Sequence, residues 1–267
     1  MKRFLTIVTV LALSAFALGA CGTVDPDDGN DPIDLTDYIN PDGQAFRGLT
    51  VDSKAMKQTM KYNVWLPPKF DETKAYPILY LLHGAGDDQN AWFDKGNAMQ
   101  IAAKYVKAGG TPMIIVMPDA QLTFYVWSGF ETYFHEELMP AVEKKYKFSG
   151  KRAVAGLSMG GYGTLYHALK YPAKFKYAYA MSPATDVGSF TAMIDAQSDK
   201  NVFPGFTIEV GTEDTTVNNA DAEKVSDYMK ANGLNAEWIA RPGIHYWNFW
   251  QECLPKALKK AGESFNN

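Results

Sequence analysis

The sequence has only two cysteines in 267 residues, Cys21 and Cys253. Two such distant cysteines exclude a disulfide-rich scaffold and cannot form the paired spacing of a zinc site. The 26 Lys and Arg residues nearly balance 30 Asp and Glu, for a net charge of −4, so the sequence offers no basic patch for nucleic-acid binding. The longest apolar run, residues 4–18, is shorter than the roughly 20 residues that a membrane span needs.

The N-terminus has the pattern of an export signal. Two basic residues precede the apolar run, and the string LGAC at 18–21 resembles the bacterial lipobox, whose Cys becomes the lipidated first residue of the mature protein. We therefore expect residues 1–20 to be a lipoprotein signal peptide and Cys21 to carry acyl chains. The alternatives are an ordinary cleaved signal peptide and a disulfide between Cys21 and Cys253.

The segment after the signal is acidic and poor in apolar residues. Residues 21–46 hold seven Asp and no Lys or Arg, and they are rich in Gly, Pro and Asn. We expect residues 21–45 to form a flexible tether, because such a composition buries too little surface to order itself. An acidic stretch after the lipidated Cys also resembles the surface-export signals of some outer-membrane lipoproteins. The expected location is the cell envelope, with the membrane contacted only through the lipid anchor.

The remaining 46–267 region is long enough for one sizeable core and too short for two. Its short apolar runs alternate with helical patterns, which predicts an α/β fold with a mostly parallel sheet. Strands are expected at 62–66, 78–82, 113–117, 153–157, 177–181, 206–210 and 236–240, and helices at 131–146, 161–170, 221–231 and 249–261. The connection from 182 to 205 is too short to hold a large helical cap.

One motif in this pattern carries chemistry. Residues 156–160 read G-L-S-M-G and fit the G-x-S-x-G nucleophile elbow, a sharp turn between a strand and a helix. The expected strand before the motif and helix after it are the context that the elbow requires. Ser158 is therefore the candidate nucleophile, and its weakly nucleophilic hydroxyl needs an adjacent base.

The four histidines allow the base to be found by elimination. In folds with this elbow the triad follows the chain order Ser, acid, His. His83 and His135 precede Ser158, and His167 lies within the helix that follows the elbow. His245 remains, on a loop directly after the last expected strand, and it is the candidate base.

The acid and the oxyanion donors have candidates at the ends of neighbouring strands. Glu213 and Asp214 both follow the strand expected at 206–210, and spacing alone does not separate them. The N–H of Met159, the residue after the nucleophile, is one expected oxyanion donor. The other is the N–H of Ala85, in the loop after the strand at 78–82.

Aromatic residues follow two other strands near this expected site. Phe124, Tyr125 and Trp127 lie in the loop after the strand at 113–117, and Trp250 lies beyond His245. Ligands of open α/β sheets bind at the carboxyl ends of the strands, which makes these four the candidate substrate-binding residues. The alternative is that their rings pack the loops onto the body of the protein.

Four strings in order along residues 46–262 resemble the esterase D and carbohydrate esterase family one group. They are LLHGAGDDQNAW, AGLSMGGYGTLYHAL, GTEDTT and PGIHYWNFWQECLPKAL. The group includes feruloyl esterases, acetyl xylan esterases, S-formylglutathione hydrolases and mycolyltransferases. The resemblance implies an α/β-hydrolase fold with helices on both faces of the sheet and no large cap domain, and neither metal nor cofactor. It assigns Ser158 as nucleophile, Asp214 as acid and His245 as base, with Met159 and Ala85 as oxyanion donors.

The strings most resemble the feruloyl esterase modules attached to xylanases. We therefore expect an exported, lipid-anchored serine esterase that hydrolyses feruloyl or acetyl esters of plant cell-wall polysaccharide through an acyl-enzyme. One alternative is a siderophore or general short-acyl carboxylesterase on the same fold. Another is a non-catalytic lipoprotein that binds glycans through Tyr and Trp. No nucleic-acid partner is expected.

The lipobox generates a testable prediction. Replacing Cys21 by Ser removes the sulfur that would carry the lipid, so the Cys21→Ser protein should leave the membrane fraction or remain as uncut precursor. Membrane fractionation and intact mass spectrometry of the wild-type and variant proteins measure this. Unchanged membrane association of the variant would point to a different anchor.

Overall fold

The computed structural model of the protein describes residues 42–266. The predictions for residues 1–20 and for Cys21 lie outside these described residues. Strand β1 (Gln44–Ser53) begins at Gln44, so the tether predicted at 21–45 extends two residues too far. Ala45 already pairs with Trp65, whose indole N–H donates to the Asp42 carbonyl at 3.0 Å.

The described residues form one eight-stranded sheet in the order β1-β2-β4-β3-β5-β6-β7-β8. Strands β3 to β8 run parallel, and β2 pairs antiparallel with both β1 and β4. The strands after β1 are β2 (Gln58–Leu66), β3 (Tyr76–Leu82), β4 (Ile114–Pro118), β5 (Phe148–Leu157), β6 (Tyr177–Met181), β7 (Gly205–Gly211) and β8 (Ala236–Arg241). This confirms the predicted α/β fold and its seven strands, while β1 was not predicted.

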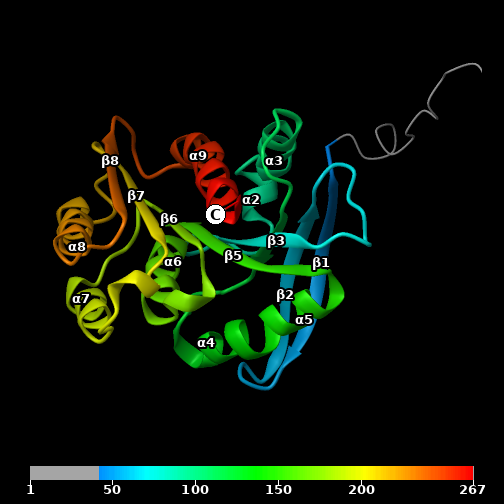
Figure 1. The fold of residues 1–267 in the computed structure, drawn as a ribbon, viewed down its shortest axis with the longest axis horizontal. Helices are drawn as coiled ribbons and strands as arrows, with labels where there is room; N and C mark the ends of the chain where they lie inside the picture. The colour runs from blue at the N-terminus through cyan, green and yellow to red at the C-terminus, as the bar shows by residue number, and fades with distance from the viewer. Residues whose placement is uncertain (1–41, 267) are drawn as a thin grey trace, which may run out of the picture. The chain divides into compact units, whose positions relative to one another are not determined.

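Helices cover both faces of the sheet (Figure 1). One face carries α2 (Ala91–Asp94), α3 (Ala98–Lys107) and α9 (Trp247–Asn266). The other carries α4 (Phe130–Thr132), α5 (Met139–Lys145), α6 (Met159–Lys170), α7 (Val187–Asp195) and α8 (Asn219–Ala231). Alternation along β3 feeds both cores, because Ile78 and Tyr80 face one cluster while Leu79 and Leu81 face the other.

The helical pattern predicted for 131–146 is present but interrupted. Between α4 and α5 the chain forms a π-helical stretch, η2 (Tyr133–Leu138). The predicted helices at 161–170, 221–231 and 249–261 correspond to α6, α8 and α9, while α3 and α7 were not predicted. The connection from β6 to β7 holds only α7 and one turn of 3₁₀ helix, η4 (Lys200–Val202). Within residues 42–266, no helix combines the length and the apolar character needed to cross a bilayer.

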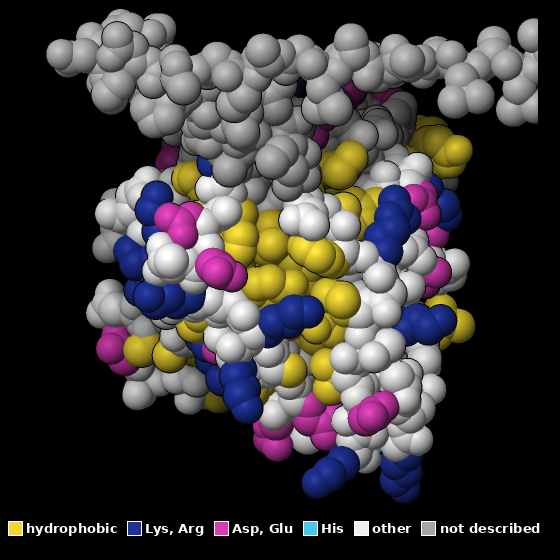
Figure 2. Space-filling model, turned by 90° about the vertical axis from the view of Figure 1, so that its right-hand side faces the viewer, with side chains coloured by type: hydrophobic (Ala, Val, Ile, Leu, Met, Phe, Trp, Pro, Cys, Tyr) yellow, Lys and Arg dark blue, Asp and Glu magenta, His cyan; other side chains and the backbone are white. Residues whose placement is uncertain are grey.

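The edge strand β1 is only partly covered. Phe46, Leu49 and Val51 of β1 are half-buried and pack on the core through one side. Figure 2, which views the molecule from the β1–β2 side, shows hydrophobic side chains gathered at the centre of this face and Lys and Arg around them.

A buried carboxylate joins the C-terminal half of the sheet to α9. The side chain of Glu209 in β7 is fully buried and accepts from Arg241 Nε at 2.5 Å, from Lys256 Nζ at 2.6 Å and from the Tyr179 hydroxyl. Burial raises the pKa of the Glu209 carboxyl, but the hydrogen bonds from Lys256, Tyr179 and Arg241 outweigh it, so the pKa is lowered. Glu209 is therefore charged and fully paired.

Removing the Glu209 carboxylate should destabilise the fold. Glu209→Ala removes the counter-charge of Lys256 and one of the two carboxylate partners of Arg241, and it leaves the buried Tyr179 hydroxyl without its acceptor, so it should lower the free energy of unfolding by roughly 3–5 kcal/mol. The matched control is Glu252→Ala, which removes another partner of Arg241 whose side chain is 67% exposed; the expected loss there is below about 1 kcal/mol. Urea unfolding of both variants measures the difference, and equal losses would contradict it.

Candidate active site

Four loops at one edge of the sheet carry the candidate catalytic residues. The parallel strands β3, β5, β7 and β8 all end at this edge. Ala85 follows β3, Ser158 follows β5, Asp214 follows β7 and His245 follows β8. Parallel strands present their carboxyl ends together, so residues 160 positions apart in the chain converge.

Ser158 sits in a strained turn between β5 and α6. Its φ of 53° and ψ of −116° are a conformation that L-residues rarely adopt. A Cβ on Gly156 would lie 2.5 Å from the Gly160 carbonyl oxygen, and one on Gly160 would lie 2.5 Å from the Leu82 carbonyl oxygen. Both motif glycines are therefore required by the close approach of strand, turn and helix, which leaves the Ser158 side chain half-buried at the sheet edge.

The structure brings Asp214, and not Glu213, to His245. His245 Nδ1 lies 2.6 Å from Asp214 Oδ2, and Asp214 Oδ1 accepts from the Thr216 N–H at 2.9 Å. The Asp214 side chain is fully buried, whereas Glu213 is exposed and contributes only its N–H, which donates to the Gly243 carbonyl at 3.0 Å. With Nδ1 donating to the carboxylate, Nε2 of His245 keeps the lone pair that a general base needs.

The loop after β3 passes directly beside Ser158. A Cβ on Gly84 would lie 2.7 Å from Leu157 Cδ1 and 3.5 Å from Ser158 Cβ, so only glycine lets the loop approach this closely. The next N–H is that of Ala85. Met159 is the first residue of α6, so its N–H belongs to the unpaired first turn of a twelve-residue helix. The two predicted oxyanion donors thus flank the nucleophile, and the helix dipole favours negative charge there.

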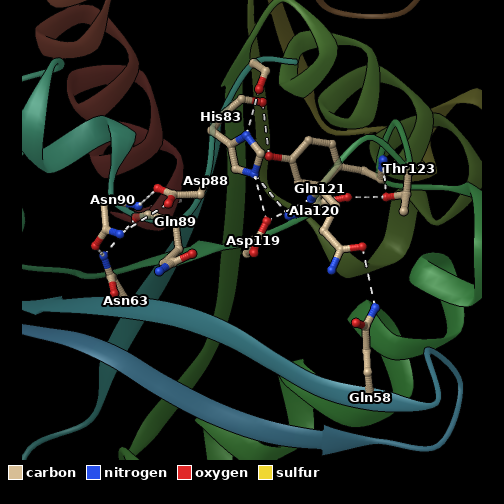
Figure 3. Close-up of polar contacts among 12 residues, drawn as sticks. Gln58, Asn63, His83, Asp88, Gln89, Asn90, Asp119, Ala120, Gln121 and Thr123 are labelled. Carbon is tan, nitrogen blue, oxygen red and sulfur yellow. Dashed lines mark hydrogen bonds and ion pairs between the residues drawn. The ribbon is translucent and has the colours of Figure 1, made fainter. Parts of the chain in front are cut away.

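His83 is a structural residue that anchors this loop (Figure 3). Its Nε2 accepts from the Ala120 N–H at 3.0 Å and its Nδ1 donates to the Gly84 carbonyl at 2.8 Å. Its own carbonyl accepts from the Tyr125 hydroxyl at 3.1 Å. Burial lowers the pKa of His83, so the ring is neutral and both ring nitrogens are engaged.

Asn63 in β2 is a second anchor, which the sequence analysis missed. Its Nδ2 donates to the Gln89 carbonyl and to Asn90 Oδ1, both at 2.9 Å (Figure 3). Its Oδ1 accepts from the Gly48 N–H at 2.7 Å. The loop after β3 is thereby tied to the β1–β2 hairpin. The available signal was a lone polar residue within the apolar run 62–66.

Two of the four predicted substrate-binding aromatics are corrected by the structure. Tyr125 is fully buried, because its ring packs over Gly163 and its hydroxyl bonds to the loop of His83. Trp250 is 5% exposed and packs edge-on against His245, with ring centroids 4.9 Å apart. Neither presents a ring face to a substrate.

The other two predicted aromatic residues, Phe124 and Trp127, are accessible to a ligand. Trp127 is 55% exposed, and the half-buried Phe124 packs against it with centroids 4.9 Å apart. Among the described residues, five large hydrophobic side chains are exposed, and four of them lie on the two loops that flank the candidate triad: Leu122, Trp127, Ile244 and Tyr246. The sequence analysis had identified only Trp127 among these four.

The two remaining histidines are buried against each other. His135 Nε2 lies 3.0 Å from His167 Nδ1. Burial lowers the pKa of His135 to about 2 and that of His167 to about 3, so both rings are neutral. His167 lies on the buried side of α6 and His135 in η2, so neither is a candidate base for the site.

Known proteins with related sequences are esterases and xylanases. A model of the family named Esterase matches residues 53–261. An endo-1,4-beta-xylanase/feruloyl esterase of Xylanibacter ruminicola is 28% identical in an alignment of 226 residues that covers 78% of this chain and 30% of the relative. Endo-1,4-beta-xylanase Y of Acetivibrio thermocellus is 29% identical in an alignment of 257 residues that covers 83% of this chain and 24% of the relative. The chain thus spans less than a third of the length of these two relatives.

Solved structures of similar fold include ferulic acid esterases. A ferulic acid esterase covers 84% of this chain and 100% of its own, with a TM-score of 0.74 and 26% identity. A ferulic acid esterase of Anaeromyces mucronatus, at 22% identity, shares the fold with a TM-score of 0.70 over 84% of this chain and 92% of its own. The chain belongs to the Esterase family and has the α/β-hydrolase fold, in agreement with the resemblance to the esterase D and carbohydrate esterase family one group.

Proposed function

We propose that Ser158, Asp214 and His245 form the catalytic triad of this esterase. The observation that carries the proposal is the 2.6 Å contact between His245 Nδ1 and the fully buried Asp214 carboxylate, on loops that follow β8 and β7 at the same edge as the elbow. Asp214 fixes the imidazole tautomer and stabilises the imidazolium that forms during reaction.

The reaction then runs in two halves. His245 Nε2 takes the proton of Ser158 as Oγ attacks the ester carbonyl, and the N–H groups of Ala85 and Met159 bind the developing oxyanion. The imidazolium gives the proton to the alcohol oxygen, the ester C–O bond breaks, and the alcohol leaves an acyl-enzyme. Water, activated by His245, attacks this acyl-enzyme and releases the acid and Ser158.

We further propose feruloyl or other hydroxycinnamoyl esters of plant cell-wall polysaccharide as the substrates. Support comes from the relatives, which are named as feruloyl esterase and xylanase, and from the exposed ring of Trp127 on the loop after β4. An exposed indole face suits a planar hydroxycinnamoyl ring. The lipobox-like string at 18–21 supports the proposal that the enzyme is exported and lipid-anchored, where polymeric substrates are met. A short-acyl esterase for acetyl groups is the alternative outcome of the test below.

The assignment of the acid is tested by a matched pair of neighbouring variants. Asp214→Asn should reduce kcat by about 10⁴, because an amide partner favours the wrong imidazole tautomer. Glu213→Gln should retain wild-type activity within about twofold, because this side chain is exposed and lacks contact with His245. Steady-state kinetics on a nitrophenyl acetate measure both. Loss of activity in Glu213→Gln together with retained activity in Asp214→Asn would reverse the assignment.

The acyl specificity is tested by Trp127→Ala on methyl ferulate and on a nitrophenyl acetate. Loss of stacking should raise KM for the aromatic ester several-fold to tenfold, since a ring pair is worth about 0.5–1.5 kcal/mol, and should leave acetate hydrolysis nearly unchanged. Ser158→Ala is the control that must abolish turnover of both esters. Equal losses in Trp127→Ala with a lowered Tm would show a packing residue, and wild-type turnover of acetate without ferulate would favour the short-acyl alternative.

A further inference from the structure

The position of His245 decides where the alcohol half of an ester lies. In the tetrahedral intermediate the reacting carbon carries Ser158 Oγ, the oxyanion, the leaving oxygen and the acyl carbon. The oxyanion faces the N–H groups of Ala85 and Met159, and the leaving oxygen must come within hydrogen-bond reach of His245 Nε2 to receive its proton. The alcohol half therefore begins beside the loop that carries His245, and its first neighbours are residues of that loop.

Tyr246, the residue after His245, presents its ring to solvent. Its side chain is 61% exposed, and Ile244 on the other side of His245 is 51% exposed. The backbone of Tyr246 is ordered, because its N–H donates to the Ile244 carbonyl at 2.8 Å and its carbonyl accepts from the Phe249 N–H at 3.1 Å. A ring held on such a turn is presented to a ligand at little further entropic cost.

A polar hollow lies along the segment that follows the proposed oxyanion donor Ala85. It has a volume of about 340 Å³, and its polar lining comes from Asp87, Asp88, Asn90, Asp94 and Lys95. The lining begins at Gly86, directly after the oxyanion donor Ala85. A volume of this size is at the lower end of the range for small-molecule sites.

Contacts between α2 and the start of α9 hold the hollow and Tyr246 side by side. Trp247, the next residue after Tyr246, packs edge-on against Trp92 of α2 with centroids 5.3 Å apart. Gln251 Nε2 donates to the Lys95 carbonyl at 2.6 Å. The hydrogen bond from Lys95 to Asp87 raises the pKa of the Lys95 ammonium, and the Tyr246 phenol adds a smaller contribution in the same direction.

The chemistry of these groups matches a polyhydroxylated ligand. Within residues 42–266 the carboxylates of Asp87 and Asp94 each use one oxygen in an ion pair, with Lys95 at 2.5 Å and Arg47 at 2.7 Å, and each keeps a second oxygen that can accept from a hydroxyl. The exposed aromatic face of Tyr246 can pack on the apolar face of a sugar ring. We propose that Tyr246 and this hollow form the subsite for the sugar at the alcohol end of the ester, an inference that rests on the proposed function.

Two esters that share one acyl group isolate this subsite. Methyl ferulate and a feruloyl ester of an arabinose-substituted xylo-oligosaccharide form the same acyl-enzyme, so only acylation, measured by kcat/KM, differs between them. Tyr246→Ala should lower kcat/KM for the sugar ester about five- to tenfold and change that for methyl ferulate less than twofold. Tyr246→Phe keeps the ring and should behave as wild type. Val202→Ala, an exposed residue of η4, is the control that should alter neither.

The hollow is tested separately by Asp94→Asn, which removes the charge but preserves the shape. The kcat/KM for the sugar ester, divided by that for methyl ferulate, should fall two- to threefold in this variant. An unchanged ratio would show that the hollow does not bind the sugar. Equal losses on both esters in Tyr246→Ala, or no loss on either, overturn the assignment of the ring. These outcomes differ from failure of the proposed function, in which the wild-type protein hydrolyses neither ester.

Discussion

The strained turn at Ser158 is the constraint on which the site depends. A backbone with a φ of 53° at a non-glycine residue costs on the order of 1–3 kcal/mol and persists only where the surroundings enforce it. Here they do so by close packing, since Gly156 and Gly160 allow strand, helix and the loop after β3 to approach within distances that any Cβ would block. The same turn starts α6 at Met159, so the nucleophile and the free N–H groups of a helix start are placed by one feature.

An oxyanion hole stabilises charge only if its donors are in place before the reaction. The loop that carries Ala85 is held from two sides by buried polar side chains. His83 binds it to the loop after β4, and Asn63 of β2 binds it to the β1–β2 hairpin, where Gly48 lies at an irregularity of β1. Hydrogen bonds in such buried surroundings are stronger than in water, and leaving one partner unpaired is costly. The β1–β2 hairpin, which bears no catalytic motif, thereby becomes part of the support for catalysis.

Strands that are buried on both faces could be predicted from the sequence, because burial on both faces requires a run of apolar residues. Four of the seven predicted strands are continuous apolar runs and the other three contain only one or two polar residues, whereas β1 is an edge strand whose half-exposed pattern resembles that of a loop. The loop after β4 was misread at Tyr125 because positive φ angles at Gln121, Phe124 and Tyr125 turn the chain without the glycine or asparagine that normally marks such turns. Glu213 and Asp214 could not be separated by spacing, because only the fold decides which of two adjacent side chains turns inward; the family resemblance chose Asp214, and the structure pairs that residue with His245.

The four exposed apolar side chains around the site bear on how water is kept from the reaction. Fully burying a large apolar side chain is worth about 1.5–3 kcal/mol, and the free protein lacks part of this stabilisation at Leu122, Trp127, Ile244 and Tyr246, which are 51–66% exposed. Single exposed apolar residues are common, but four on two loops that flank one site form a surface that a ligand can cover. The short connection that holds α7 provides no large cap over these loops. For the proposed mechanism this means that a bound ester covers these rings itself, and an ester that is bulky on both sides of its carbonyl would exclude more water from the proposed oxyanion donors than a methyl or acetyl ester.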